Sequence, residues 1–151
     1  MRVEEAKIDE IEKIIDLGEF FVEESPSLSL MTYSRDVFEK FCKHMITHKD
    51  NCMFLLKDKD KILGILTGGL KSRIGSEEKS LSEYIFYVHK SARKHGGGKE
   101  LMDRFCKWGK DRNAKTVEIG ATSDIDPKKA DAYMQKMGFK YMGANFYKEL
   151  K

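Results

Sequence analysis

The sequence is poor in cysteine and proline, and it has no long apolar run. Its three cysteines, Cys42, Cys52 and Cys106, are an odd number and form no C-x-x-C motif, so we expect reduced thiols rather than structural disulfides. No apolar run approaches the roughly 20 residues of a membrane-spanning helix. The N-terminal residues also lack the apolar region of a signal peptide. We therefore expect a cytoplasmic protein that has no membrane partner.

The chain also lacks a marked excess of charge. Its 28 lysine and arginine residues stand against 25 aspartate and glutamate residues, a net charge of +3. Nucleic-acid-binding domains concentrate basic residues on one face, so we expect no nucleic-acid partner. A weaker alternative is a peptide or RNA binder that uses the basic residues of segment 90–99. That segment has no aromatic residue, which disfavours stacking on single-stranded bases.

What the chain does have is enough apolar residues, 40% of 151, for one domain over residues 1–151. Apolar residues recur every three to four residues, as in helices, or in short strand-like runs. In chain order these patterns predict helices over residues 3–24 and 34–48, followed by strands over 52–57, 61–70 and 81–89. A helix over 98–112 and a strand over 116–122 come next. A short helix then begins at Pro127, capped by Asp126, and ends at Gly138, before a last strand or pair. The order, ααββ followed by βαβαβ, predicts an α/β fold of mixed α+β character with some parallel pairing.

Three consecutive glycines, Gly96, Gly97 and Gly98, lie between an expected strand and an expected helix. Inside either element each glycine costs roughly 1 kcal/mol relative to alanine. Main-chain N–H groups without side chains in the way can converge at the positive end of the helix dipole, which suits a pyrophosphate. The nearby Arg93, Lys94 and Lys99 would add charge-assisted contacts. The plainer interpretation is a tight strand-to-helix turn without a ligand.

Two common phosphate-binding motifs do not fit this segment. The nucleotide-hydrolase loop needs Ser or Thr after Gly-Lys, but Glu100 follows Gly98 and Lys99. The dinucleotide motif G-x-G-x-x-G fails as well, because Leu101 stands where its last glycine would be.

A third pattern fits. Residues 93–98, R-K-H-G-G-G, match R-x-x-G-x-G and resemble the acyl-CoA-binding segment of the GNAT-type N-acetyltransferase superfamily. Residues 130–139, A-D-A-Y-M-Q-K-M-G-F, resemble the late helix-to-strand segment of that family. The order of elements agrees over nearly the whole chain. The resemblance implies an acyl-CoA N-acyltransferase fold, in which helices flank a central mixed, largely antiparallel sheet that splays where two strands part.

The resemblance also implies a site for acetyl-CoA as co-substrate. The pantetheine arm would lie where the strands part, and the diphosphate would contact the main-chain N–H groups of residues 95–99. The residues expected to bind the cofactor are Tyr87, Val88, Arg93, Lys94, His95, Gly96, Gly97, Gly98 and Lys99. We expect no metal. His44, His48 and Cys52 are spaced by four residues, but the helix is expected to end before Cys52.

The function implied is transfer of an acetyl group from acetyl-CoA to a primary amine, on a small molecule or a protein. In this family the amine attacks the thioester directly, so no covalent nucleophile is needed. The resemblance also allows a homodimer, an arrangement frequent in the family. The alternative is a catalytically silent CoA-binding or protein-interaction module on the same fold.

Acetyl transfer needs a base for the amine and a proton for the departing thiolate. The family often uses as acid a tyrosine four residues before the glycine of K-x-G-F, but this chain has Met134 there, with Tyr133 one residue earlier. One residue is a rotation of about 100° on a helix. We expect Tyr133 to serve as the acid, and packing on the sheet is the plainer interpretation of the same residue.

The expected base is Glu83, the only carboxylate in the strand over 81–89. Strand alternation predicts that Glu83, Ile85 and Tyr87 share one face, where the carboxylate could accept the amine proton through water. The plainer interpretation is an exposed charge near the start of a strand.

Overall fold

The computed structural model describes residues 1–120 and 123–150. Within them, five strands form one sheet: β1 (Arg2–Glu5), β2 (Asn51–Asp58), β3 (Lys61–Ser72), β4 (Lys79–Val88) and β5 (Thr116–Glu118). The α-helices in the same residues are α1 (Ile11–Glu24), α2 (Arg35–Thr47), α3 (Gly97–Asp111) and α4 (Pro127–Lys136). Short 3-10 turns lie in the connections: η1 (Ile8–Glu10), η2 (Leu28–Leu30) and η3 (Lys90–Ala92).

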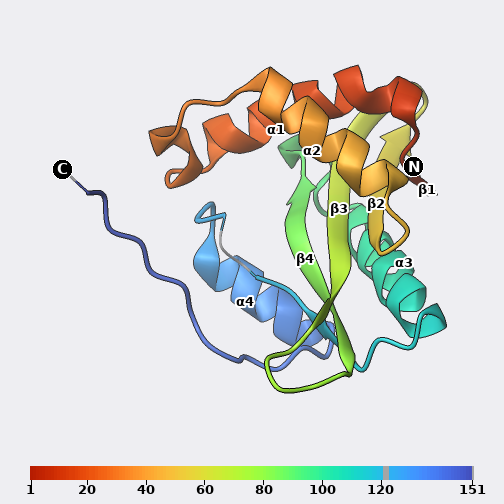
Figure 1. Ribbon diagram of the computed structural model, residues 1–151. Helices are drawn as coiled ribbons and strands as arrows, with labels where there is room; N and C mark the ends of the chain where they lie inside the picture. Colours follow the sequence, from red (N-terminus) through yellow and green to blue (C-terminus); the bar gives the residue numbers. More distant parts are fainter. Residues whose placement is uncertain (121–122, 151) are drawn as a thin grey trace.

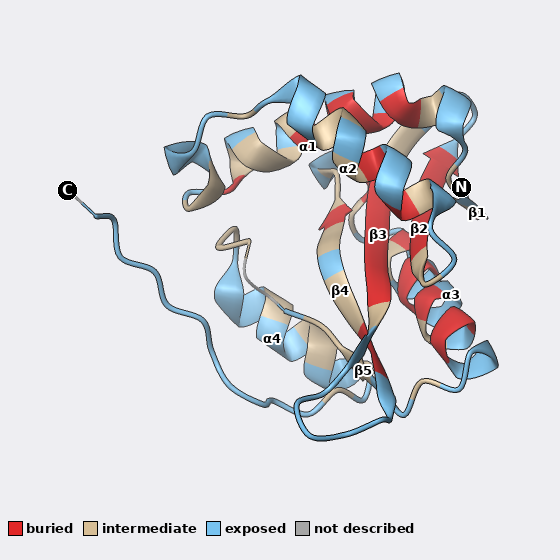
Figure 2. Cartoon of the chain, in the orientation of Figure 1, coloured by how far each residue is buried: buried red, intermediate tan, exposed pale blue. Residues whose placement is uncertain are grey.

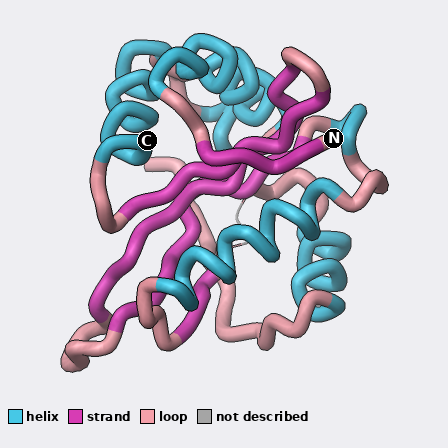
Figure 3. Tube along the Cα trace, turned by 90° about the vertical axis from the view of Figure 1, so that its right-hand side faces the viewer, coloured by secondary structure: helices cyan, strands magenta, loops and turns pink. Residues whose placement is uncertain are grey.

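The sheet is mixed and largely antiparallel. Its strands follow the sequence in the order β1-β2-β3-β4-β5, antiparallel from β1 to β4 and parallel between β4 and β5. The helices α1 and α2 cover one face, and α3 and α4 cover the other (Figure 1). The view turned by 90° shows helices on both sides of the sheet (Figure 3). The α/β fold with a mixed, largely antiparallel sheet is therefore confirmed.

The core lies on both faces of the sheet because β2 is buried on both. Phe54 and Leu56 belong to the cluster under α3, whereas the alternate residues Met53 and Leu55 belong to the cluster under α1 and α2. None of these four side chains is more than 3% exposed, and the burial of each contributes about 1.5–3 kcal/mol. Figure 2 shows the buried residues concentrated along β2 and β3. The sheet is thus a firm support for the loops at its ends.

Local sequence signals mark the start of α2 and both ends of α4, and those of α4 are as predicted. The hydroxyl of Ser34 caps α2 by accepting a hydrogen bond from a main-chain N–H at 3.3 Å. The carboxylate of Asp126 caps α4 in the same way at 3.2 Å, and Pro127 is the first residue of that helix. Gly138 follows the end of α4 with a φ of +88°, a conformation that favours glycine.

The prediction of a helix from residue 3 to residue 24 is wrong at its start. Arg2–Glu5 form β1, which pairs with β2, and the helix α1 begins only at Ile11. Val3 is 7% exposed and lies opposite Leu56. A strand with one buried residue shows too little alternation to be distinguished from the apolar periodicity of the helix that follows it.

The predicted last strand is also wrong, and β5 is shorter than expected. Residues 139–150 form no strand in the described part of the chain and run away from the body of the protein (Figure 1). Phe139 still packs against the core, but the large apolar side chains after it stay exposed, with Phe146 at 93% and Leu150 at 89%. A strand needs a hydrogen-bonded neighbour, and an apolar pattern alone does not supply one. Of the strand expected over 116–122, Thr116–Glu118 are extended, while residues 121–122 lie outside the described part.

Candidate active site

The site is built around the point where β4 and β5 part. β5 pairs with β4 only at Ser80, Leu81 and Ser82, although β4 continues to Val88. Within the described residues, the edge of β4 over residues 83–88 that faces away from β3 therefore has no strand partner; we call it the β4 free edge. Its main-chain N–H and C=O groups can bind an extended ligand in the way that an added strand would.

Glu83 lies at the start of the β4 free edge, next to a β-bulge. In the pairing with β3, Gly68 lies opposite Glu83 and Thr67 lies opposite Ile85, so Tyr84 is the extra residue. Because neighbouring residues of β3 point to opposite faces, Glu83 and Ile85 do so as well. The prediction that Glu83, Ile85 and Tyr87 share one face is therefore wrong, and the bulge is the reason.

The carboxyl of Glu83 is half-buried and accepts a hydrogen bond from the main-chain N–H of Gly120 at 2.9 Å. Burial raises the pKa of this carboxyl to about 7, while the hydrogen bond from Gly120 acts in the opposite direction. At neutral pH the protonated and ionised forms are then present in comparable amounts. A group with this pKa can accept a proton from an amine and return it to solvent.

The three glycines have three different physical roles. Gly96 caps α3 with a φ of +79°, and a Cβ there would meet no atom within 4 Å. A Cβ on Gly97 would overlap the buried side chain of Leu56 in β2. A Cβ on Gly98 would lie 2.9 Å from the hydroxyl oxygen of Tyr133. Two of the three glycines thus allow close packing whether or not a ligand is bound.

At the start of α3, several main-chain N–H groups have no hydrogen-bond acceptor within the described residues. The first hydrogen bond of the helix runs from Glu100 N–H to Gly96 O at 3.1 Å. Among the hydrogen bonds of the described residues, none has the main-chain N–H of Gly97, Gly98 or Lys99 as donor. Donors at the positive end of a helix dipole bind anions such as phosphates.

The basic side chains of this segment are arranged less uniformly than expected. Lys94 and His95 are exposed, and Lys99 pairs with Asp103 one turn along α3 at 2.5 Å. The guanidinium of Arg93 faces the other way and forms an ion pair with Glu24, the last residue of α1. The loop therefore presents the side chain of Lys94 to solvent, while Arg93 is paired with Glu24.

The helix α4 directs Tyr133 and Met134 to different places. Met134 packs against the core cluster under α3, whereas the hydroxyl of Tyr133 lies close to Gly98. Burial, and to a smaller extent the charge of Asp103, raise the pKa of Tyr133. Tyr133 thus contacts the start of α3, next to the free main-chain donors, and remains protonated at neutral pH.

Two residues of this region were missed from the sequence, Glu24 and Ser25. Glu24 pairs with Arg93, and the buried hydroxyl of Ser25 donates to the main-chain carbonyl of Ser123. From the sequence, Pro26 shows only that a helix ends before it. Nothing there indicates that Glu24 contacts Arg93 or that Ser25 contacts Ser123.

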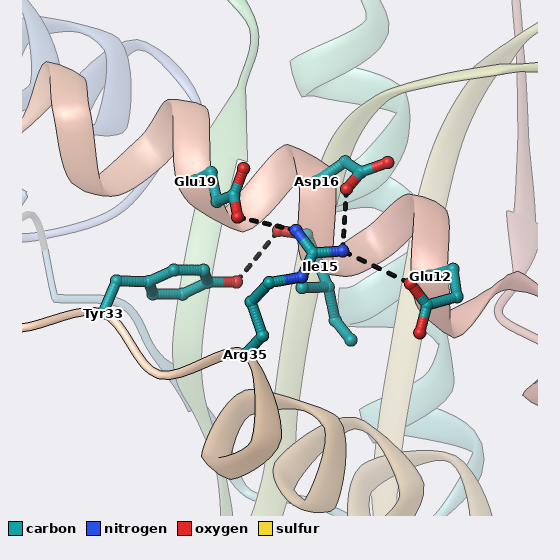
Figure 4. Close-up of polar contacts among 6 residues, drawn as sticks. All are labelled: Glu12, Ile15, Asp16, Glu19, Tyr33 and Arg35. Atoms are coloured by element: carbon teal, nitrogen blue, oxygen red, sulfur yellow. Dashed lines mark hydrogen bonds and ion pairs between the residues drawn. The ribbon is translucent and has the colours of Figure 1, made fainter.

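The helices α1 and α2 are tied together beside this region. The guanidinium of Arg35 contacts the carboxylates of Glu19 at 2.6 Å, Asp16 at 3.0 Å and Glu12 at 3.3 Å, all on α1 (Figure 4). The hydroxyl of Tyr33 donates to Ile15 O of the same helix at 2.9 Å (Figure 4). One cation at the start of α2 thus compensates a row of acidic side chains on α1.

Residues 1–120 and 123–150 contain neither a candidate metal site nor a helix that could span a membrane. No group of three or more His, Cys, Asp or Glu side chains in these residues is placed to hold a metal ion. None of the helices described is both long enough and apolar enough to cross a bilayer.

The geometry agrees with a known family. The model of the acetyltransferase (GNAT) family matches residues 15–139. The chain belongs to this family. The protein is accordingly an acyl-CoA-dependent N-acetyltransferase, on a fold that binds acetyl-CoA or CoA. No curated protein matches the chain in sequence.

Solved structures of acetyltransferases share the fold at low sequence identity. The aminoglycoside N-acetyltransferase AAC(6')-Iy in complex with CoA superposes with a TM-score of 0.78 at 13% identity, covering 98% of this chain and 93% of that one. AAC(6')-IG from Acinetobacter haemolyticus gives 0.75 at 15%, covering 100% and 99%. Glucosamine-6-phosphate N-acetyltransferase from Arabidopsis thaliana gives 0.75 at 12%, covering 99% and 98%. At such identities these likenesses concern the fold and not the acceptor.

Proposed function

We propose that the protein transfers the acetyl group of acetyl-CoA to a primary amine by direct attack of the amine on the thioester. The observation that carries this proposal is the position of Glu83. Its carboxyl, with a pKa of about 7, lies at one end of the β4 free edge, and the free donors of α3 follow beyond the other end. The β4 free edge thus runs from a base to an anion site, and the extended pantetheine arm of acetyl-CoA can form hydrogen bonds along it.

For binding, we assign the pantetheine arm to the β4 free edge near Tyr87 and Val88. The diphosphate is assigned to the main chain of residues 95–99, where the N–H groups of Gly97, Gly98 and Lys99 have no acceptor within the described part of the chain. The exposed Lys94 adds a positive charge beside these donors.

In the reaction, the amine nitrogen bonds to the thioester carbonyl carbon, and the carbon–sulfur bond breaks. The proton lost by the amine passes to the Glu83 carboxylate, directly or through one water. The thiolate of CoA takes up a proton, for which Tyr133 is our candidate donor. Because its hydroxyl lies beside Gly98, at the diphosphate end of the β4 free edge, this proton would have to pass through water. No cysteine is needed as a nucleophile, and burial raises the pKa values of Cys42 and Cys52 to about 12, which keeps both as unreactive thiols.

The acceptor that we propose is a small-molecule amine, with a protein amine as the other option. Three of the solved structures with this fold carry names of small-molecule acetyltransferases: two act on aminoglycosides and one on glucosamine-6-phosphate. The acidic residue Asp124 follows Ser123, which contacts the end of α1, and its charge favours a cationic acceptor. A homodimer remains a prediction.

Two measurements on the purified protein test this function. Calorimetric titration with CoA measures binding, and release of free thiol from acetyl-CoA with a panel of amines measures turnover. We expect micromolar binding, on the order of many enzyme–substrate affinities, and amine-dependent thiol release that Glu83→Gln reduces without loss of CoA binding. Binding without turnover across the panel would support the catalytically silent module instead, and no binding would exclude both functions.

A further inference from the structure

We propose that Arg93, the first residue of R-x-x-G-x-G, is a positioning residue in this protein rather than a ligand of the diphosphate. With Glu24 and Tyr87 it locks the end of α1 to the end of β4 and to the loop before α3. We call these three residues the Arg93 clamp. The inference deepens the proposed function and rests on it, because the clamp shapes the acetyl-CoA site assigned above.

The contacts of the clamp are short and mutually supporting. Arg93 Nη1 lies 2.6 Å from Glu24 Oε1, and Arg93 Nη2 donates to Glu24 Oε2 at 2.9 Å, a bidentate pair. Arg93 Nε donates to Val88 O at 2.8 Å, and the hydroxyl of Tyr87 donates to Glu24 Oε2 at 2.8 Å. All three of these residues are at least half-buried. Bidentate arginine–carboxylate pairs are among the stronger side-chain contacts and fix direction as well as distance.

The Glu24 carboxylate compensates the positive charge of Arg93, which weakens the attraction of Arg93 for a phosphate. Burial acts to raise the pKa of Glu24, but the hydrogen bonds from Arg93 and Tyr87 outweigh it and lower that pKa. Burial and the adjacent Glu24 carboxylate raise the pKa of Tyr87. At neutral pH the clamp therefore consists of one cation, one anion and one neutral hydroxyl. To bind a diphosphate through its charge, Arg93 would have to give up its bidentate partner.

The clamp acts across the parting of the strands. Glu24 ends α1 and contacts the β4 side, whereas the next residue, Ser25, donates to Ser123 O on the β5 side. The end of α1 thus contacts both sides of the region in which β4 has lost its β5 partner. This arrangement fixes how far the two sides lie apart, and with it the width available to the pantetheine arm.

A double-mutant cycle separates the clamp from a direct contact. We expect Arg93→Gln and Glu24→Gln each to raise the Kd for CoA roughly 10-fold, because each breaks the same pair. The double variant should bind about as weakly as either single variant. If Arg93 instead contacts the diphosphate, Glu24→Gln frees the guanidinium and lowers the Kd, and Arg93→Gln raises the Kd at least as much in the Glu24→Gln background as in the wild type. That outcome overturns the inference.

Further measurements exclude a merely structural effect. Every variant is titrated at a temperature at which its circular dichroism shows it to be folded. Tyr87→Phe keeps the ion pair and removes one hydrogen bond, so we expect a smaller rise in the Kd. In turnover, the clamp variants should raise the KM for acetyl-CoA more than they lower kcat.

A matched control is the exposed pair Lys107 and Asp111, 2.7 Å apart near the end of α3. Lys107→Gln and Asp111→Asn should leave the Kd unchanged. A wild-type protein that does not bind CoA overturns the proposed function together with this inference. Wild-type binding with multiplicative effects of the two clamp variants overturns the inference alone.

Discussion

The carboxylate of Glu83 accepts a hydrogen bond from the N–H of Gly120 at 2.9 Å, across the point where β4 and β5 part. One residue before Glu83, the two strands still pair through their main chains, Ser82 with Glu118. The Glu83 side chain thus links the two segments just beyond the last main-chain pair between β4 and β5. The same place combines burial, which raises the pKa, with access to the β4 free edge.

We expect Glu83→Gln to lower kcat roughly 10²-fold, a typical contribution of general base catalysis, with the Kd for CoA unchanged. In the wild type, kcat/KM should rise with pH through an apparent pKa near 7, because the carboxyl must lose its proton to act as the base. The variant should lack this ionisation. A wild-type profile retained by Glu83→Gln would assign the ionisation to another group.

The same substitution should change stability in a pH-dependent way. The folded-state pKa of Glu83, about 7, lies above its ordinary value of 4.5, so the stabilisation associated with the protonated form is complete below about pH 4.5 and is lost as the pH rises through 7. Glu83→Gln removes this loss. We expect the Tm of the variant relative to wild type to increase between pH 5 and pH 8.5, measured by thermal denaturation. A constant difference would contradict the raised pKa.

Alanine substitutions at Gly96 and Gly97 should lower the folding stability by different amounts. Gly97→Ala forces a Cβ against Leu56, which is fully buried, and overpacking costs about 1–3 kcal/mol. Gly96→Ala meets open space and costs only the strain of a positive φ, about 1 kcal/mol. Gly97→Ala should therefore lower the Tm more. Adding Leu56→Val, which removes the δ carbons, should cost less in the Gly97→Ala background than in wild type.

For Tyr133 we expect loss of the hydroxyl to affect turnover and not binding. Tyr133→Phe should lower kcat roughly 10²-fold if the hydroxyl donates the proton to the thiolate, with an unchanged Kd for CoA. Tyr141→Phe is the matched control, because Tyr141 is 70% exposed in the segment after α4. Unchanged turnover in Tyr133→Phe would leave this tyrosine with a packing role beside Gly98.

Arg35 offers a test of the tie between α1 and α2. Arg35→Gln leaves Glu12, Asp16 and Glu19 without their shared cation, so like charges on α1 repel. All of these groups are exposed, and we expect a fall in Tm of only roughly 1–3 °C that shrinks at high salt. Lys43→Gln, which removes a single pair with Glu39, should have a smaller effect. A fall in Tm that salt does not reduce would indicate lost packing instead.

The parts of this protein that could be predicted are those with local causes. Ser34 and Asp126 cap their helices because each side chain needs only the next turn of the same helix. The hairpin of β2 and β3 follows from two apolar runs around a polar turn. The glycines indicated a special turn before α3, although their packing against Leu56 and Tyr133 was hidden. Those neighbours are distant in sequence.

The residues themselves determined the fold class, the start of α4 and the presence of a special turn before α3, because capping, periodicity and glycine geometry act over a few residues. Only the tertiary structure decided that residues 2–5 join the sheet, that a bulge turns Glu83 to the other face from Ile85, and that Arg93 pairs with Glu24. Glu24 and Arg93 are 69 residues apart. Such contacts depend on how elements pack and register against one another, and no spacing along the chain encodes that.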